Sequence, residues 1–259
     1  MAETFSDTIK SGTIKSCTIK SDTVKLDKRG SGVLMVAHRG LSGLETENTQ
    51  CAFVAAANRS YYGIETDVHV TKDGRYVISH DGNLSRVFGK NIEIKDYLYE
   101  DLRKVRKTEN GAAIEYMSVP SLEEYFDVCR RYGKKSVLEL KVEYTDEQLK
   151  EIIQIAKNAG QFENVIFISF FVGNMIRLRK ILPDHPLQLL TGEINPEVID
   201  ICEKNSLAID VCYTALNAEN AAELKRRGIK INCWTVNDRA DAEKLISLGV
   251  DFITTNILE

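Results

Sequence analysis

The chain has 259 residues, of which 43% are hydrophobic and 28% charged, and its formal net charge is −4. This composition is typical of a folded globular protein and excludes a disordered or fibrous chain. The acidic balance gives no overall attraction to a nucleic-acid backbone, so we expect no nucleic-acid partner, and any phosphate chemistry must come from a local site.

Six cysteines are spread along the chain without a Cys-x-x-Cys pair. This pattern indicates neither a zinc site nor a small disulfide framework. The N-terminal sequence MAETFSDTIK lacks a basic segment followed by an apolar one, and no run approaches the roughly 18 apolar residues of a membrane span. We therefore expect a cytoplasmic, reduced protein without a transmembrane segment. Its oligomeric state is not indicated.

The first 31 residues contain a five-residue unit that recurs as SDTIK, SGTIK, SCTIK and SDTVK. An odd period cannot keep one face of a strand, because strand side chains alternate with period 2. We interpret residues 1–31 as a polar arm or a short hairpin lying against the following domain. A role in binding a lipid surface or a partner is the alternative.

From Val33 onward, short β-branched runs alternate with longer amphipathic stretches, which is typical of repeated βα units. The predicted strands are 33–38, 62–68, 136–141, 165–169, 187–190, 207–211, 229–234 and 250–254. The predicted helices include 48–59, 121–132, 146–159, 173–182, 196–205, 217–227 and 239–248. This α/β pattern predicts a (β/α)8 TIM barrel over residues 32–259. A doubly wound open sheet is the alternative.

The connection after the second strand is unusually long. It contains a further short strand, YVISHD at 76–81, followed by a mixed polar segment, 82–118. Connections of this length are usually functional rather than plain turns. We predict that 82–118 forms a small insertion over the barrel mouth that shapes substrate access.

Acidic residues mark the ends of two predicted strands. Strand alternation places Glu65 and Asp67 on one side, and Glu139 and Lys141 on one side of another strand. In a barrel these strand ends form the face on which active sites are built. Three converging carboxylates repel one another unless a cation intervenes, and Mg2+ or Ca2+ prefers such oxygen ligands. For any single acid, a salt-bridged or solvated strand end is the alternative interpretation.

Two of the four histidines, His38 and His80, also end predicted strands. Histidines at such positions serve either as hydrogen-bonded scaffold or as acid and base catalysts, and the neighbouring acids favour catalysis. Arg39 adds a planar cation suited to holding a phosphate. His69 is expected to point away from the Glu65 and Asp67 side, and His185, in LPDHP, is expected in a surface turn.

These residues lie in motifs that resemble the glycerophosphodiester phosphodiesterase family. The motifs, in order, are HRG at 38–40, ENT at 47–49, IETDVHVTKDG at 64–74, VISHDGNLSR at 77–86, VPSLEE at 119–124, LELK at 138–141 and GVDFITTN at 249–256. The resemblance runs from about residue 33 to the C-terminus. Thr46 stands where the family has a proline before Glu-Asn-Thr, which removes a restriction on the loop backbone.

The resemblance implies His38 and His80 as the acid and base pair, and Glu65, Asp67 and Glu139 as ligands of a divalent metal ion, Mg2+ or Ca2+. It further implies that Arg39 and Lys141 contact the phosphate and that Trp234 lines the substrate pocket. Lys141 is otherwise suited to pairing with nearby carboxylates, and Trp234 to ordinary packing.

The implied function is metal-dependent hydrolysis of a small glycerophosphodiester to an alcohol and glycerol 3-phosphate. Attack by water and attack by the substrate's own glycerol hydroxyl, through a cyclic phosphate, both stay open. A lysophospholipase D or a phosphatidylinositol-type phosphodiesterase is one alternative function. A non-catalytic barrel that binds phosphorylated ligands is the other. The alcohol head group and the physiological ion are not indicated.

Overall fold

The computed structural model describes residues 22–28 and 30–259. Most of the pentapeptide repeats, and with them most of the predicted arm 1–31, lie outside the described residues. The described part of the arm runs beside the C-terminal residues: Val24 forms a parallel bridge with Leu258, and the Leu26 N–H donates to the Glu259 carbonyl over 2.7 Å. The boundaries of the arm and of the domain stay predictions.

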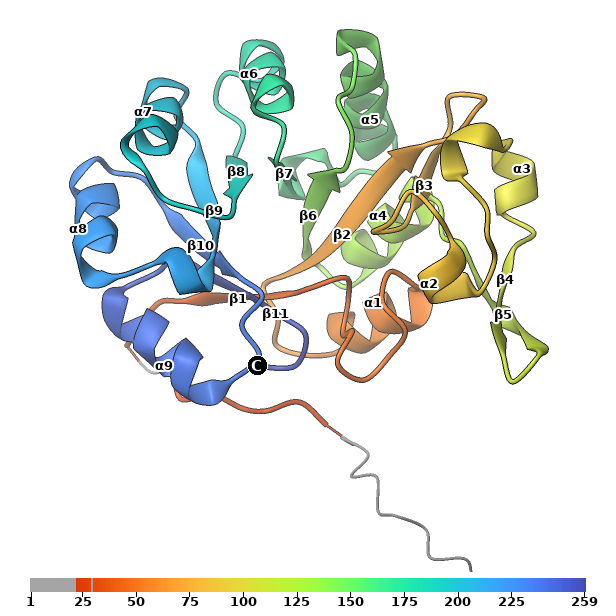
Figure 1. Ribbon diagram of the computed structural model, residues 1–259, viewed down its shortest axis with the longest axis horizontal. Helices are drawn as coiled ribbons and strands as arrows, with labels where there is room; N and C mark the ends of the chain where they lie inside the picture. The colour runs from red at the N-terminus through yellow and green to blue at the C-terminus, as the bar shows by residue number, and fades with distance from the viewer. Residues whose placement is uncertain (1–21, 29) are drawn as a thin grey trace, which may run out of the picture.

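Eight parallel strands close into a barrel, as predicted, and the open doubly wound sheet is excluded (Figure 1). The strands are β1 (Leu34–Ala37), β2 (Gly63–Val70), β6 (Lys135–Leu140), β7 (Val165–Ser169), β8 (Leu187–Thr191), β9 (Ala208–Cys212), β10 (Ile231–Trp234) and β11 (Phe252–Thr255). Neighbouring strands pair in this order, and β1 pairs with both β11 and β2. β-branched and aliphatic residues dominate these runs because both faces of each strand are covered.

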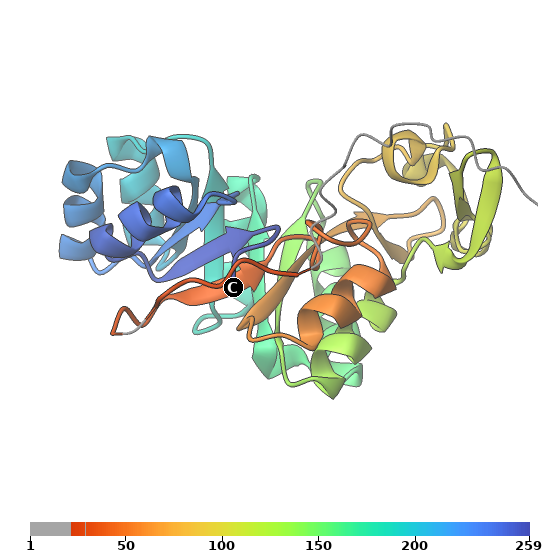
Figure 2. The ribbon, with the colours of Figure 1, turned by 90° about the horizontal axis from the view of Figure 1, so that it is seen from below.

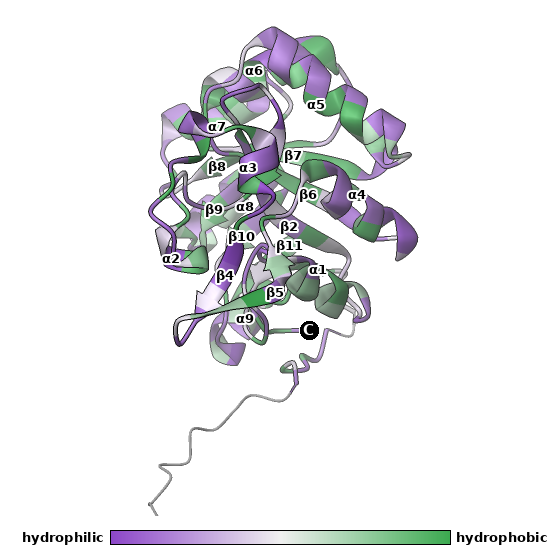
Figure 3. Ribbon diagram, turned by 90° about the vertical axis from the view of Figure 1, so that its right-hand side faces the viewer, coloured by the Kyte–Doolittle hydropathy of each residue, from purple (hydrophilic) through white to green (hydrophobic). Residues whose placement is uncertain are grey.

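Seven helices follow the first seven barrel strands. They are α1 (Gln50–Ala57), α4 (Leu122–Arg131), α5 (Asp146–Asn158), α6 (Val172–Ile181), α7 (Pro196–Lys204), α8 (Ala218–Arg226) and α9 (Arg239–Leu248). Side-chain caps fix where several begin: Ser121, Thr145 and Asn217 each form a reciprocal capping box. In Figure 3, helix α4 is largely purple while strand β7 is largely green, as expected for polar helices around an apolar barrel.

The core has two main layers. The larger one lies between strands and helices and includes Phe53, Phe126 and Phe167. The smaller one fills the barrel interior with Val36, Val137, Ile166, Ile168, Leu190 and Phe252. Side chains therefore fill the middle of the barrel, and polar groups are confined mainly to its two ends.

The segment between β2 and α4 is more ordered than a polar loop. It contains β3 (Tyr76–Ile78), α2 (Ser85–Phe88), the 3-10 turn η1 (Ile94–Asp96), α3 (Tyr99–Leu102), β4 (Arg106–Glu109) and β5 (Ala112–Ser118). These elements stand beside the barrel, on the side away from α7, α8 and α9 (Figure 2). They share a small core of their own, formed by Val77, Leu84, Phe88, Ile94, Leu102 and Val119.

Strand β3 is shorter than the predicted 76–81. It pairs antiparallel with the end of β2, and the pairing stops at Ile78. His80 and Asp81 therefore lie in the loop beyond the strand, where their side chains are free of the alternation that a ladder imposes.

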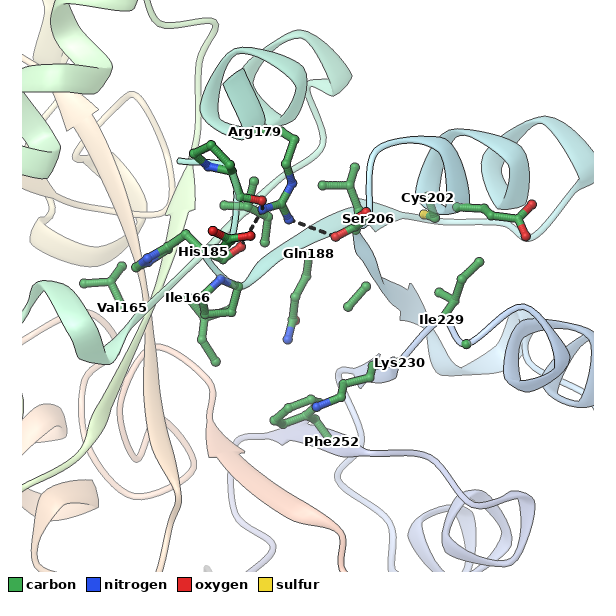
Figure 4. A pocket seen from close by; sticks show the side chains of 18 of the residues that line it. Val165, Ile166, Arg179, His185, Gln188, Cys202, Ser206, Ile229, Lys230 and Phe252 are labelled. Atoms are coloured by element: carbon green, nitrogen blue, oxygen red, sulfur yellow. Dashed lines mark hydrogen bonds between the residues drawn. The ribbon is translucent and has the colours of Figure 1, made fainter. Parts of the chain in front are cut away.

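A cavity of about 610 Å3 opens at the end of the barrel where the strands begin (Figure 4). Phe252, Gln188 and Lys230 line it from the starts of three strands. Behind the rim, Asn232 Nδ2 donates to Gln188 Oε1 over 3.0 Å, and Thr254 Oγ1 donates to Asn232 Oδ1 over 3.1 Å. This polar chain closes the base of the apolar interior.

Within the described residues, no helix has the length and apolar character that crossing a membrane would require.

Candidate active site

Three carboxylates meet where β2 and β6 end. The two strands run side by side with Asp67 directly opposite Glu139, and Glu65 stands on the same face of β2. One oxygen from each carboxylate lies within 4.8 Å of the others, and all three residues are buried. The predicted convergence of Glu65, Asp67 and Glu139 is therefore present in the structure.

Their electrostatics reflect this crowding. Burial, together with the charges of Asp67 and Glu139, raises the pKa of Glu65 well above its usual range. Burial and the charge of Asp67 raise the pKa of Glu139 to about 7. Burial opposes ionisation of Asp67 too, but the charges of Lys141 and Arg39 outweigh it and lower the pKa of Asp67 to about 2.

Lys141 compensates part of this negative charge. Its Nζ lies 2.9 Å from Glu139 Oε1 and 3.4 Å from Asp67 Oδ1. It thus pairs with Glu139 itself as well as with Asp67. Burial works against the ammonium group, but the two carboxylates raise the pKa of Lys141. Lys141 therefore stays charged at the edge of the cluster.

The cluster fits a hard divalent cation. Within the described part of the chain, Asp67 Oδ1 is buried and accepts no hydrogen bond. Glu65 and Glu139 add carboxylate oxygens, the ligand type that Mg2+ and Ca2+ prefer. Lys141 and Arg39 bring two positive charges to three carboxylates, and Arg39 is shared with Glu47, so the donor set favours a further positive charge among these oxygens. The residues do not distinguish between the two ions.

His38 follows β1 and faces the same cluster. Its Nε2 lies 4.0 Å from Glu65 Oε2, while its Nδ1 lies 2.7 Å from Asn256 Oδ1. The amide oxygen can only accept, so Nδ1 carries the proton and Nε2 holds the lone pair. Burial, and after it the charge of Arg39, lowers the pKa of His38 to about 4.

Arg39 has a left-handed backbone with φ +55° and ties the first strand to the second. Its N–H donates to Glu65 Oε2 over 2.7 Å, and its guanidinium donates to Glu47 over 2.8 Å and lies 3.6 Å from Asp67. Gly40 beside it allows close packing on α1, because a Cβ there would lie 2.6 Å from the Ala52 carbonyl carbon.

His80 enters from the loop after β3. Its Nδ1 lies 2.7 Å from Asp81 Oδ1, and both side chains are about one-third exposed. The carboxylate can only accept this hydrogen bond, so Nδ1 carries a proton and the ring is oriented by Asp81 through that nitrogen. His38 and His80 thus occupy different surroundings, one among buried groups and the other beside an acid at the edge.

Trp234 ends β10 at the same face. It is partly buried, its Nε1 donates to the Asp210 carbonyl over 3.0 Å, and its ring packs edge-on against Phe170 with 5.7 Å between centroids. Asp210 itself was not predicted as a site residue. Its side chain is buried, and burial together with the charge of Glu139 raises its pKa well above the usual range.

Two expectations about the other histidines need correction. His69 is two residues beyond Asp67, so alternation places it on the same side as Glu65 and Asp67, and the expectation that it points away is wrong. Its Nε2 lies 3.2 Å from the His80 carbonyl. His185 does lie in a turn, but it is half-buried because its ring stacks on Phe162 with centroids 4.8 Å apart.

Three supporting residues were not assigned roles in advance. Asn48, with φ +53°, donates from Nδ2 to Asp67 Oδ2 over 2.7 Å and accepts from the Thr66 hydroxyl. Asn256 orients His38, and Arg86 contacts both Asp81 and Glu47. All three lie within the motifs quoted above, but their contacts depend on loop geometry that spacing does not provide.

An eight-stranded barrel with these ionisable groups at the carboxyl ends of its strands defines a TIM-barrel enzyme. Residues 38–259 match the Glycerophosphoryl diester phosphodiesterase family. The chain is 31% identical to a glycerophosphodiester phosphodiesterase of Caldanaerobacter subterraneus subsp. tengcongensis over 86% of this chain and 93% of that protein.

Solved structures agree in fold. A glycerophosphodiester phosphodiesterase from Thermotoga maritima is 28% identical, with a TM-score of 0.67 over 86% of this chain and 94% of that one. An Oleispira antarctica phosphodiesterase in complex with its product sn-glycerol-3-phosphate has a TM-score of 0.76 at 23% identity, over 86% and 92% of the two chains. The chain belongs to the glycerophosphoryl diester phosphodiesterase family, and the expected enzyme class, a phosphodiesterase, is confirmed.

Proposed function

We propose that this protein hydrolyses small glycerophosphodiesters to an alcohol and glycerol 3-phosphate with the help of a divalent metal ion. The observation that carries the proposal is the buried cluster of Glu65, Asp67 and Glu139 within reach of a histidine and two cations. The product bound to the Oleispira enzyme, a relative in fold, supports glycerol 3-phosphate as one half of the substrate.

Glu65, Asp67 and Glu139 would hold the ion, which when bound supplies positive charge for the non-bridging phosphate oxygens. Arg39 and Lys141 lie beside the same carboxylates and are suited to bind those oxygens. Both cations are largely buried, so their attraction for the phosphate is screened less than at the surface. They favour the extra charge that develops on the phosphoryl group in the transition state.

The two histidines divide the proton transfers. We assign His38 as the base, because its Nδ1–H donates to Asn256 and leaves the Nε2 lone pair free. We assign His80 as the acid, because Asp81 accepts from its Nδ1–H and leaves Nε2 as the ring nitrogen that can carry the second proton of the imidazolium. His38 takes the proton of the attacking hydroxyl as its oxygen bonds to phosphorus. The bond from phosphorus to the alcohol oxygen breaks with its electron pair, and that oxygen takes the proton of His80 Nε2.

The attacking hydroxyl is either water or the glycerol hydroxyl of the substrate. In the second route a cyclic phosphate forms first and is then hydrolysed. A cyclic product detected at short times supports the second route, and incorporation of solvent oxygen without any cyclic species supports the first.

The proposal is tested by measuring hydrolysis of glycerophosphocholine and glycerophosphoethanolamine by the metal-stripped protein, before and after Mg2+, Ca2+ or Mn2+ is added back separately. We expect free choline or ethanolamine and glycerol 3-phosphate only after a metal is restored, because three crowded carboxylates need a cation to bind an anionic substrate. Full activity in the presence of a strong chelator contradicts the metal requirement. Tight ligand binding without turnover under every metal favours the non-catalytic alternative.

A lipid-directed activity is the second candidate, and an apolar surface at the mouth favours it. Phe170 and Phe171 are 47% and 39% exposed, and Phe170 contacts Trp234. A groove of about 480 Å3, lined in part by Phe170, Leu190, Val198 and Ile201, begins at the same place. Such a surface is suited to an acyl chain. Hydrolysis of a lysophospholipid, with no hydrolysis of the small diesters, supports this candidate over the first.

A further inference from the structure

Arg86 occupies the centre of a chain of ion pairs that joins the two sides of the candidate site. Its Nε donates to Asp81 Oδ2 over 2.6 Å, and its Nη1 and Nη2 donate to Glu47 Oε2 and Oε1, each over 2.8 Å. Asp81 holds His80, and Glu47 accepts from Arg39. All three guanidinium nitrogens are thus used to connect the groups that hold His80 and Arg39.

The backbone beneath Arg86 is firmly placed. Arg86 stands on the short helix α2 of the segment between β2 and α4 (Figure 1). Leu84 and Phe88, on either side of it, are almost fully buried in the small core of that segment. Asn83 Oδ1 accepts from the Ser85 N–H over 2.8 Å at the start of the helix. The guanidinium therefore projects from a fixed base toward the loops that carry Glu47 and Asp81.

The shape of the guanidinium explains why an arginine suits this position. A planar fork can bond one carboxylate with two parallel N–H groups and a second carboxylate with its third nitrogen. A lysine offers a single ammonium point and cannot hold both acids in fixed orientations. The Arg86 side chain is 48% exposed, so solvent screens these ion pairs and they contribute little to stability. Orientation of the acids is the effect that remains.

Resting on the proposed function, we propose that Arg86 is a positioning residue that sets His80 for protonation of the leaving alcohol. With Arg86 in place, Asp81 has one oxygen fixed by the guanidinium and the other directed at His80 Nδ1. Without it, the partly exposed Asp81 side chain is free to turn toward water, and His80 loses the bond that fixes its ring. Arg39 also loses the anchoring of Glu47, which loosens phosphate binding.

The test compares two substrates that differ in the leaving group alone. Glycerophosphocholine releases an alkoxide that needs a proton, whereas the 4-nitrophenyl ester of glycerol 3-phosphate releases a stable anion that does not. For Arg86→Gln we expect kcat on glycerophosphocholine to fall about ten- to a hundred-fold, with a much smaller fall on the nitrophenyl ester. KM should rise by about the same factor for the two substrates. The kcat of Arg86→Lys on glycerophosphocholine should lie between the kcat of Arg86→Gln and that of the parent protein.

Two further variants make the outcome decisive. Arg130→Gln removes a comparably exposed ion-pairing arginine, bonded to Asp127 on helix α4, and should leave both substrates unaffected. His80→Asn should show the same selective loss as Arg86→Gln, but a larger one. Equal kcat losses on both substrates in Arg86→Gln, or none on either, overturn the positioning role. If His80→Asn turns over glycerophosphocholine normally, the acid assignment in the proposed function fails instead.

Discussion

Several residues of the candidate site act through single, well-defined contacts. Asn48 is the clearest case. Its side chain accepts a hydrogen bond from the Thr66 hydroxyl and donates one to Asp67, and its backbone is left-handed, with φ +53°. Asparagine is among the few non-glycine residues that adopt this conformation readily. Asn48 therefore both adopts the left-handed conformation of this loop and orients the Asp67 carboxylate. Substitutions can separate these two contributions.

We expect Asn48→Gly and Asn48→Ala both to weaken binding of Mg2+ or Mn2+ about ten- to a hundred-fold, because both free Asp67 from its amide partner. Asn48→Ala should in addition lower the free energy of unfolding by about 1–2 kcal/mol relative to Asn48→Gly, since alanine disfavours positive φ. Calorimetric titration and denaturant unfolding measure the two effects. Unchanged metal affinity in both variants contradicts the orienting role.

At the scale of elements, the strand that closes the barrel is buttressed by a segment outside the barrel. The Glu259 carboxylate accepts from Thr23 Oγ1 and the Ser60 N–H, each over 2.6 Å, and pairs with Lys25 over 2.7 Å. These contacts fasten residues 22–28 along the residues that follow β11. Burial opposes ionisation, but Lys25, Thr23 and Ser60 lower the pKa of Glu259 to about 2.

Because the folded-state pKa is below the usual value of 4.5, the ionised Glu259 stabilises the fold above that value, and its contribution fades as the pH falls toward about 2. We expect Glu259→Gln to lower the free energy of unfolding by about 1–2 kcal/mol at pH 7. The difference from the parent should narrow below about pH 4.5. Urea unfolding at several pH values measures it, with the exposed Glu243→Gln as control; a gap that widens on acidification contradicts the assignment.

The length of an element decides whether the sequence predicts it. Long barrel strands and helices follow from periodicity, and alternation combined with the pairing of consecutive barrel strands brings Glu65, Asp67 and Glu139 together. The same rule places His69 on their side of β2, because it stands two residues beyond Asp67. Helices α2 and α3 span four residues each, too short to show a helical period, so the core around Phe88 was not foreseen. The contacts of Arg86 depend on that core.

At the scale of the whole molecule, the barrel separates two polar ends by an apolar interior. One end carries the candidate active site, and the other opens into the cavity lined by Gln188 and Lys230. In TIM barrels the end where strands begin serves stability, whereas chemistry gathers where strands end. The two ends should therefore respond differently to substitution.

We expect Gln188→Leu to lower the free energy of unfolding by about 1–3 kcal/mol, because Asn232 loses its buried acceptor. Saturating kcat should stay close to that of the parent, since the change lies across the apolar interior from His80. Thermal unfolding and steady-state kinetics on glycerophosphocholine measure the two properties. A kcat loss as large as that of His80→Asn would show that the ends are coupled.

The pairing between β1 and β2 gives one candidate metal ligand, Glu65, a structural role as well. Two residue pairs join these strands, against six between β2 and β6. Glu65 reinforces this pairing, because its side chain accepts from the Arg39 N–H and its carbonyl from the Gly40 N–H. In a homologue that has lost hydrolytic activity, Glu65 should still be retained, because it helps to keep the barrel closed. Substitutions should appear first at His80 or Lys141, whose side chains do not join β1 to β2.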